Sequence, residues 1–184
     1  MTTVSDMYPE YYLPKAEIDK IVMSSILHDV GKISIPDGIL NKPGRLTKEE
    51  FETMKLHTVN GAEILSKIPN MMDEDVFNYS YDISRHHHER WDGRGYPDGL
   101  KGDEITIWSQ VVAVADVYDA LTSPRVYKAA FDHQTAMKMI YGGECGIFNP
   151  KVLEAFGKCI QKIEKTDAEL FSQEKEQQET GTEV

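Results

Sequence analysis

The spacing of apolar positions predicts a chain that is built from helices. Apolar residues recur at helical intervals between Glu17 and Leu27, so a helix is expected there that leads directly into His28 and Asp29. Gly31 should end or interrupt this helix. His28 and Asp29, the first candidate site residues in the chain, are therefore expected at a helix terminus.

A second helix is expected after Thr47, which stands three residues before Glu50 in the arrangement of a capping box. This helix should carry His57 near its middle and end before Pro69. A third helix should run over residues 74–90 and present three consecutive histidines near its C-terminal end. No convincing pair of strands occurs, so the expected fold class is all-α. The other expected elements are a glycine-rich loop at 91–106 and helices at 107–121, 132–141 and 149–163.

Composition narrows the class of protein. A chain of 184 residues, 40% of them hydrophobic, fits one domain over 1–165, followed by an acidic tail over 166–184 that is expected to be disordered. The net charge of −11 argues against a broad DNA- or RNA-binding surface. Neither a membrane-spanning apolar run nor a signal peptide is evident. Two scattered cysteines, Cys145 and Cys159, favour a reducing, cytoplasmic location over a disulfide framework.

Histidines and carboxylates gather in four short stretches, and they are ligand types that transition metals prefer. Between the third and fourth stretches lies a rigid glycine-rich loop at 91–97, whose backbone could contact a phosphate. A metal centre beside such a loop indicates metal-assisted cleavage of a phosphate ester. The four stretches are His28-Asp29, His57, His87-His88-Glu89 and Asp116.

Each of these features also has an ordinary structural interpretation. Asp116 lies in an apolar helical segment, where a buried carboxylate is costly unless a metal, a salt bridge or a solvent-facing position compensates it. His28 and Asp29 could be plain polar residues at a helix end, and at most two of the three consecutive histidines can face one point. Arg125 and Lys128 suit phosphate oxygens, but they could equally be solvated surface charges.

Taken together in this order, the motifs resemble the HD-GYP family of bacterial phosphodiesterases, a branch of the HD metal-dependent hydrolases. The resemblance extends over residues 17–163. The most specific block is the long motif that runs from His87 to Pro97. The other matching blocks are Leu27–Ile33, Ile35–Asp37, Lys42–Thr47, Met54–Thr58, Gly61–Leu65, Gly99–Gly102 and Val112–Thr122, with Arg125 and Lys128.

The resemblance implies an HD-domain-like helical bundle that hydrolyses cyclic di-GMP, a bacterial second messenger, to the linear dinucleotide or to GMP. It also implies a centre of two or three divalent metal ions, with iron or manganese expected. The metal ligands that it implies are His28, Asp29, His57, His87, His88 and Asp116.

Roles for the remaining site residues also follow from the resemblance. Asp29 and Lys32 are the implied catalytic residues: Asp29 would bridge two metal ions, and Lys32 would neutralise developing charge or protonate the leaving oxygen. The implied substrate-binding residues are Gly95, Tyr96 and Pro97 for the guanine or ribose, and Arg125 and Lys128 for phosphate.

The chain departs from the family pattern in one respect. Family members normally carry another metal-ligating histidine on a helix upstream of the His-Asp pair, but no histidine precedes His28 here. We therefore expect slow turnover, unless Glu10, Glu17 or Asp19 substitutes, and an exposed apolar surface that favours a homodimer or a docking partner. Two alternative functions stay open: a nucleotide-binding or scaffold protein with impaired catalysis, and an HD hydrolase of another nucleotide, which the Gly-Tyr-Pro loop disfavours.

Overall fold

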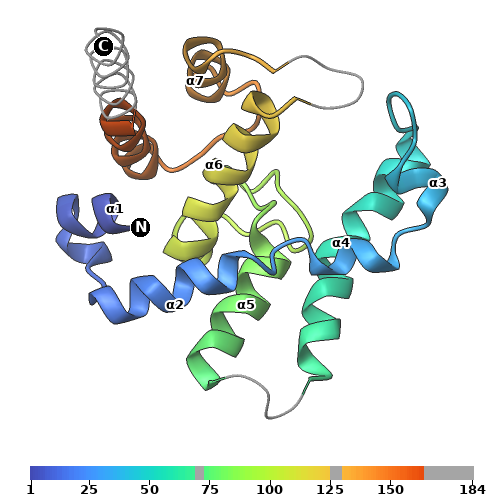
Figure 1. Cartoon of the computed structure of the whole chain (residues 1–184), viewed down its shortest axis with the longest axis horizontal. Helices are drawn as coiled ribbons and strands as arrows, with labels where there is room; N and C mark the ends of the chain where they lie inside the picture. Colours follow the sequence, from blue (N-terminus) through green and yellow to red (C-terminus); the bar gives the residue numbers. More distant parts are fainter. Residues whose placement is uncertain (69–72, 125–129, 164–184) are drawn as a thin grey trace, which may run out of the picture.

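The structure is a computed structural model that describes residues 1–68, 73–124 and 130–163. Helices are the only regular elements in these ranges, apart from an isolated bridge between Asp92 and Lys101, so the predicted all-α class is confirmed (Figure 1). Residues 150–163 are also helical. The named elements are α1 (Thr2–Met7), η1 (Pro9–Tyr11), α2 (Lys15–Ser25), η2 (Val30–Ser34), α3 (Asp37–Leu40), α4 (Lys48–Ser66), α5 (Glu74–His86), η3 (Gly102–Glu104), α6 (Ile107–Thr122) and α7 (His133–Tyr141).

Side-chain caps start the helices where the sequence predicts them. Thr47 Oγ1 accepts the Glu50 N–H at 3.2 Å and the Glu50 carboxylate accepts the Thr47 N–H at 2.7 Å, which is the expected capping box of α4. Asp132 caps α7, because its carboxylate accepts the Thr135 N–H at 2.7 Å. Asn149 accepts a backbone N–H at 2.9 Å at the start of the last helix. These local hydrogen bonds need no tertiary contact, so the pattern alone was sufficient to predict them.

Two helices end earlier than expected. α2 stops at Ser25 and α5 stops at His86, so neither helix reaches the histidines that follow it. The chain continues through tight turns, in which the His28 N–H donates to the Ser25 carbonyl at 3.2 Å and the Glu89 N–H donates to the His86 carbonyl at 2.9 Å. Such i to i+3 bonds tighten a helix end and bring side chains three residues apart onto the same side.

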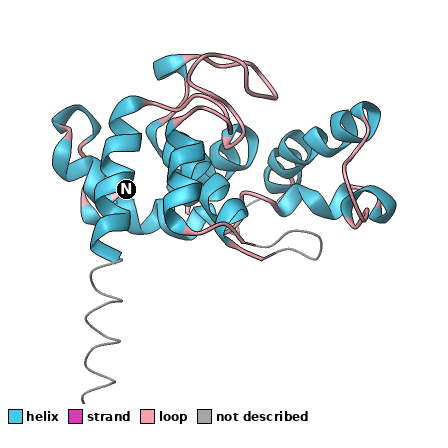
Figure 2. Ribbon diagram, turned by 90° about the horizontal axis from the view of Figure 1, so that it is seen from above, coloured by secondary structure: helices cyan, strands magenta, loops and turns pink. Residues whose placement is uncertain are grey.

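α5 is the centre of the fold and packs against α2, α4 and α6 (Figure 1). α1 lies at one end of the molecule near the last helix, and α3 lies at the opposite end, as both views show (Figure 2). Buried apolar residues of α6, α7 and the last helix form a continuous core on one side of this arrangement. The turns after α2 and α5 thereby come together in the middle of the molecule.

Two glycines allow the turn after α2 to touch the backbone of α4. A Cβ on Gly31 would lie 1.9 Å from the His57 carbonyl oxygen and 2.4 Å from the Gly61 nitrogen. A Cβ on Gly61 would lie 2.3 Å from Ser84 Oγ. No larger side chain fits at either position, so η2 lies directly on α4 and Asp29 is held beside His57.

None of the helices in the described ranges is long and apolar enough to cross a membrane. The tail expected over 166–184, and with it the predicted domain end at 165, lies outside the described residues.

Candidate metal centre

The Asp29 carboxylate lies at the centre of the histidine cluster. Its Oδ1 atom is 3.4 Å from His57 Nε2 and 3.8 Å from His87 Nε2. Its Oδ2 atom is 3.3 Å from His28 Nε2 and also accepts a short hydrogen bond from the Lys32 ammonium. The two oxygens therefore face two different groups of side chains, which is the arrangement that a bridging carboxylate requires.

Three imidazoles converge on the Oδ1 side of Asp29. One ring nitrogen from each of His57, His87 and His88 lies within 4.8 Å of the others, and His57 Nε2 is 3.4 Å from His87 Nε2. His86 points elsewhere, toward Asp82. His87 and His88 therefore face the cluster and His86 does not, in agreement with the expectation that at most two of the three consecutive histidines can face one point.

Backbone carbonyls set the orientation of these rings. The Nδ1 atom of His57 donates to the Met54 carbonyl at 2.7 Å, and Nδ1 of His87 donates to the Ile83 carbonyl at 2.9 Å. His28 Nδ1 likewise donates to a carbonyl at 2.8 Å. Because a carbonyl can only accept, each Nδ1 carries the proton, and in the neutral rings of His57 and His87 the Nε2 atom presents a lone pair to the centre. Imidazole ligands of metals are normally held in this way.

Burial keeps the imidazoles around Oδ1 neutral. It lowers the pKa of His57, and together with the nearby His28 and His57 it lowers the pKa of His87 to about 3. Burial and the neighbouring His87 also lower the pKa of His88 below its ordinary value. Neutral imidazoles keep the lone pairs that a cation needs, so the rings are available as ligands at neutral pH.

The Oδ2 side of Asp29 carries the second group. Asp116 Oδ1 lies 3.8 Å from His28 Nε2, and burial raises the pKa of Asp116, with the Asp29 carboxylate adding to the rise and His28 opposing it. The hydrogen bond to Asp29 raises the pKa of His28. Despite burial, hydrogen bonds from His28 and Lys32 lower the pKa of Asp29. Because two partly buried carboxylates repel each other, a cation bound between them would be stabilised.

A cleft of about 380 Å³ opens directly beside this second group. Lys32 and His88 line it together with Asp116 and Cys145, and the rest of its wall is apolar and comes from the second half of α6. Lys32 therefore lies next to the cluster, as the resemblance to the HD-GYP family implies. The cleft has the size of a small-molecule site.

The donor set fits a divalent metal centre. Asp29 Oδ1 is buried and has no hydrogen-bond partner among the described residues, although it faces two imidazole nitrogens that carry no proton. An unpaired buried carboxylate oxygen is costly, and a cation shared with the imidazoles would satisfy it. Nitrogen and oxygen donors of this kind suit zinc, iron and manganese alike.

The glycine-rich loop lies against the cluster. Tyr96 stacks on His88 with ring centroids 4.8 Å apart and an angle of 28° between the planes. A Cβ on Gly95 would lie 2.3 Å from the Glu89 Cα, so the loop passes the α5 terminus at backbone contact. Pro97 follows Tyr96 through a cis peptide bond. The three residues expected to line the substrate are therefore adjacent to the histidines.

Other predicted residues lie elsewhere or outside the described ranges. Arg125 and Lys128 fall in the segment 125–129, so their placement is not described. The three candidates for a substitute ligand are all engaged away from the cluster: Glu10 pairs with Lys151, Glu17 accepts from Tyr79, and Asp19 pairs with Lys15.

Sequence reasoning missed the buried groups that hold the loop. Glu89 is 2% exposed, and its Oε1 accepts the N–H groups of Asp98 and Gly99 at 2.8 and 3.1 Å. Arg90 donates at 3.2 Å to the carbonyl of Cys145. The only available signal was the position of Glu89 and Arg90 directly after the histidines.

A second buried network joins α5 to the start of α6. The Asp82 carboxylate accepts hydrogen bonds from Thr106, Trp108, Ser109 and His86. Despite burial, the hydrogen bonds from His86, Thr106 and Ser109 lower the pKa of Asp82. Because α6 carries Asp116, this network contributes to the position of Asp116 relative to the histidines.

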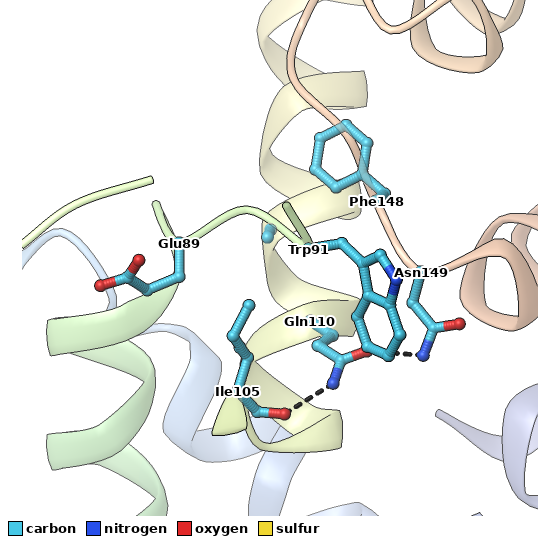
Figure 3. A pocket seen from close by; sticks show the side chains of 7 residues that line it. Glu89, Trp91, Ile105, Gln110, Phe148 and Asn149 are labelled. Atoms are coloured by element: carbon cyan, nitrogen blue, oxygen red, sulfur yellow. Dashed lines mark hydrogen bonds between the residues drawn. The ribbon is translucent and has the colours of Figure 1, made fainter. Parts of the chain in front are cut away.

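The far side of the loop is anchored around a cavity of about 10 Å³ (Figure 3). Gln110 of α6 donates to the Ile105 carbonyl at 2.6 Å and accepts from Asn149 at 2.8 Å. Trp91 and Phe148 pack beside them, whereas the Glu89 carboxylate points away from this group (Figure 3). Such a cavity can hold one water molecule at most, so its role is structural.

Fold and site together define a helical protein with a cluster of histidines and carboxylates that could hold a metal ion. A family model described as an HD domain matches residues 2–151, and the chain belongs to this family. Membership implies dependence on a divalent metal, in agreement with the histidine cluster. The family predicted from the sequence motifs is thereby confirmed.

Several curated proteins are similar to this chain. It is 43% identical over 154 residues to a probable cyclic di-GMP phosphodiesterase of Vibrio cholerae, covering 83% of this chain and 35% of that protein. It is 43% identical over 160 residues to a cyclic di-GMP phosphodiesterase of Thermotoga maritima, covering 87% and 41%. A 3'3'-cGAMP-specific phosphodiesterase of Vibrio cholerae is 40% identical over 144 residues, covering 78% and 27%. The chain therefore spans less than half the length of each of these relatives.

Among solved structures, the fold is similar to that of Bd1817, an HDG"Y"P protein from Bdellovibrio bacteriovorus. The TM-score is 0.59 at 20% sequence identity, and the similarity covers 77% of this chain and 43% of that one. The predicted HD-domain-like helical bundle is confirmed by this similarity in fold.

Proposed function

We propose that this chain is a metal-dependent phosphodiesterase domain that hydrolyses cyclic di-GMP to the linear dinucleotide or to GMP. The observation that carries the proposal is the Asp29 carboxylate, whose two oxygens face two separate groups of metal-ligand side chains. The names of the relatives at 43% identity support the choice of substrate.

The geometry suggests how the ligands divide between metal positions. His57, His87 and His88 would hold one divalent ion with Asp29 Oδ1, and the second group would hold another with Oδ2. We propose iron or manganese at these two positions, with room for a third ion left open. The second group consists of His28 and Asp116.

Divalent ions in this centre would polarise the phosphodiester and supply a nucleophilic water at neutral pH. The side chains of the protein have separate tasks. Lys32 lies between Asp29 and the adjacent cleft, where its ammonium can neutralise charge that develops on phosphate or give a proton to the leaving oxygen.

Substrate contacts are proposed for the loop and for the segment after α6. Gly95, Tyr96 and Pro97 lie beside the histidines, in a position to line the ribose or the base. Arg125 and Lys128, outside the described residues, are proposed to bind phosphate.

A second candidate substrate is 3'3'-cGAMP. It is favoured by the similarity to the 3'3'-cGAMP-specific enzyme, which at 40% identity is nearly as similar as the cyclic di-GMP enzymes. The metal centre would serve either cyclic dinucleotide equally, so the two substrates must be compared directly.

A homodimer or a docking partner is also proposed. Large apolar side chains are exposed in the segments that flank His28 and Asp29 in the chain, including Ile26 at 78% and Ile33 at 83%. Exposed apolar groups of this kind tend to be covered in assemblies.

The function can be tested by measuring metal content and turnover on the same sample after anaerobic reconstitution with iron or manganese. We expect about two ions per chain, as two-metal hydrolysis requires, and cleavage of cyclic di-GMP that disappears when the metal is removed. Parallel assays with 3'3'-cGAMP identify the preferred substrate. Full metal content with no cleavage of either nucleotide would contradict the proposed activity and favour a binding protein.

A further inference from the structure

An exposed aromatic ring lies next to the metal centre on α4. Phe51 is 45% exposed, and its ring makes an edge contact with Tyr96, with centroids 6.3 Å apart and an angle of 82° between the planes. Tyr96 in turn stacks on His88 at 4.8 Å. The rings thus form a continuous series from the histidine cluster to solvent, and Phe51 is its outer member.

A lysine completes the group. The Lys55 ammonium lies 5.1 Å from the ring centroid of Phe51 and 5.5 Å from that of Tyr96, in the angle between the two perpendicular rings. Lys55 is one helical turn after Phe51, so both side chains share one face of α4. Its other partner is the exposed Glu52, at 2.7 Å.

We propose that Phe51 and Lys55 extend the loop residue Tyr96 into a platform for one purine base of the cyclic dinucleotide. The base would stack on the open face of Phe51, and the Lys55 ammonium would donate to an acceptor atom of the purine, such as O6 or N7 of guanine. The inference rests on the proposed function and deepens it, because it assigns base recognition to α4.

Three observations favour a base over an ordinary surface contact. Phe51 is 45% exposed beside the site, so part of its ring is accessible to a ligand. The ring series leads to His88, so a base on Phe51 would place its attached phosphates toward the metal centre. The cleft with Lys32 opens on the α6 side of His88, which leaves the α4 side for the second half of a two-base ligand.

The test is equilibrium binding of a non-hydrolysable phosphorothioate analogue of cyclic di-GMP to the metal-loaded protein, measured by calorimetry. Phe51→Ala should weaken binding about 5- to 150-fold, the range for loss of one base–aromatic stack. Phe51→Trp should keep the affinity, because indole also stacks. Lys55→Gln should weaken binding roughly 2- to 5-fold, since its ammonium stays partly exposed.

Leu56→Ala is the matched control. Leu56 is 50% exposed on the same helix, and helical geometry turns it roughly 140° away from Phe51, so this variant should bind like the unsubstituted protein. Unchanged affinity in Phe51→Ala, when the unsubstituted protein binds the analogue, would overturn the platform and leave the proposed function intact. Failure of the unsubstituted protein to bind the analogue would overturn both.

Discussion

Replacing Asp29 with alanine is expected to lower the cleavage of cyclic di-GMP by at least about 1,000-fold and to remove most of the bound metal. The two carboxylate oxygens of Asp29 face His57 and His28, with contacts of 3.4 and 3.3 Å. Its loss leaves the two groups of side chains with no shared carboxylate between them. Neither metal position would then keep its ligand number, so both binding and rate should fall.

The appropriate control is Asp19→Ala. Asp19 belongs to the preceding helix, is well exposed, and makes only a surface ion pair with Lys15 at 3.3 Å. It should leave both metal content and rate unchanged. Metal content is measured by mass spectrometry and cleavage by chromatography of the linear product. An Asp29→Ala protein that keeps its metal and cleaves within tenfold of the original rate would rule out the bridging role.

Gly31→Ala is expected to destabilise the fold by more than about 4 kcal/mol, which places it among the exceptional substitutions. The new Cβ would overlap the His57 carbonyl oxygen at 1.9 Å and the Gly61 nitrogen at 2.4 Å, and both are backbone atoms that cannot rotate away. Relief requires η2 to separate from α4, which would also move Asp29 away from His57. Loss of stability and loss of metal should therefore occur together.

Urea denaturation followed by circular dichroism measures this effect. Gly38→Ala is the matched control, because a Cβ at Gly38 meets nothing within 4 Å and alanine is the better helix former within α3. The control should therefore be neutral or slightly stabilising. A Gly31→Ala protein that unfolds at the same urea concentration as the original would show that η2 does not contact α4 as closely as described.

The helix starts and the site composition were accessible from the sequence because they depend on local patterns. The capping box at Thr47 and the cap at Asp132 are short-range hydrogen bonds, and both form as predicted. The expected ligand set was implied by the resemblance to the HD-GYP family, and a carboxylate at Asp116 in an apolar helix gave one of these ligands an independent physical reason. The structure brings these ligands together, and their role as ligands stays a proposal.

Features that depend on tertiary packing could not be predicted in this way. The contact between Gly31 and Gly61 joins segments thirty residues apart, and no periodicity marks it. The Asp82 network depends on donors that lie 24 to 27 residues farther along the chain. The early end of α5 at His86 likewise follows from the turn that packs the loop against the histidines. The platform on α4 was missed because an exposed Phe51 has no distinctive sequence signal.

Anomalous X-ray scattering from crystals of the manganese- or iron-loaded protein tests the central claim most directly. The account predicts a strong peak roughly 2.0–2.3 Å from imidazole nitrogens of His57, His87 and His88 and from the Asp29 carboxylate, the bond length expected of such donors. A second peak should lie on the other side of Asp29, near His28 and Asp116. Peaks confined to other parts of the surface, with the imidazoles free, would contradict the assignment of this cluster as the metal centre.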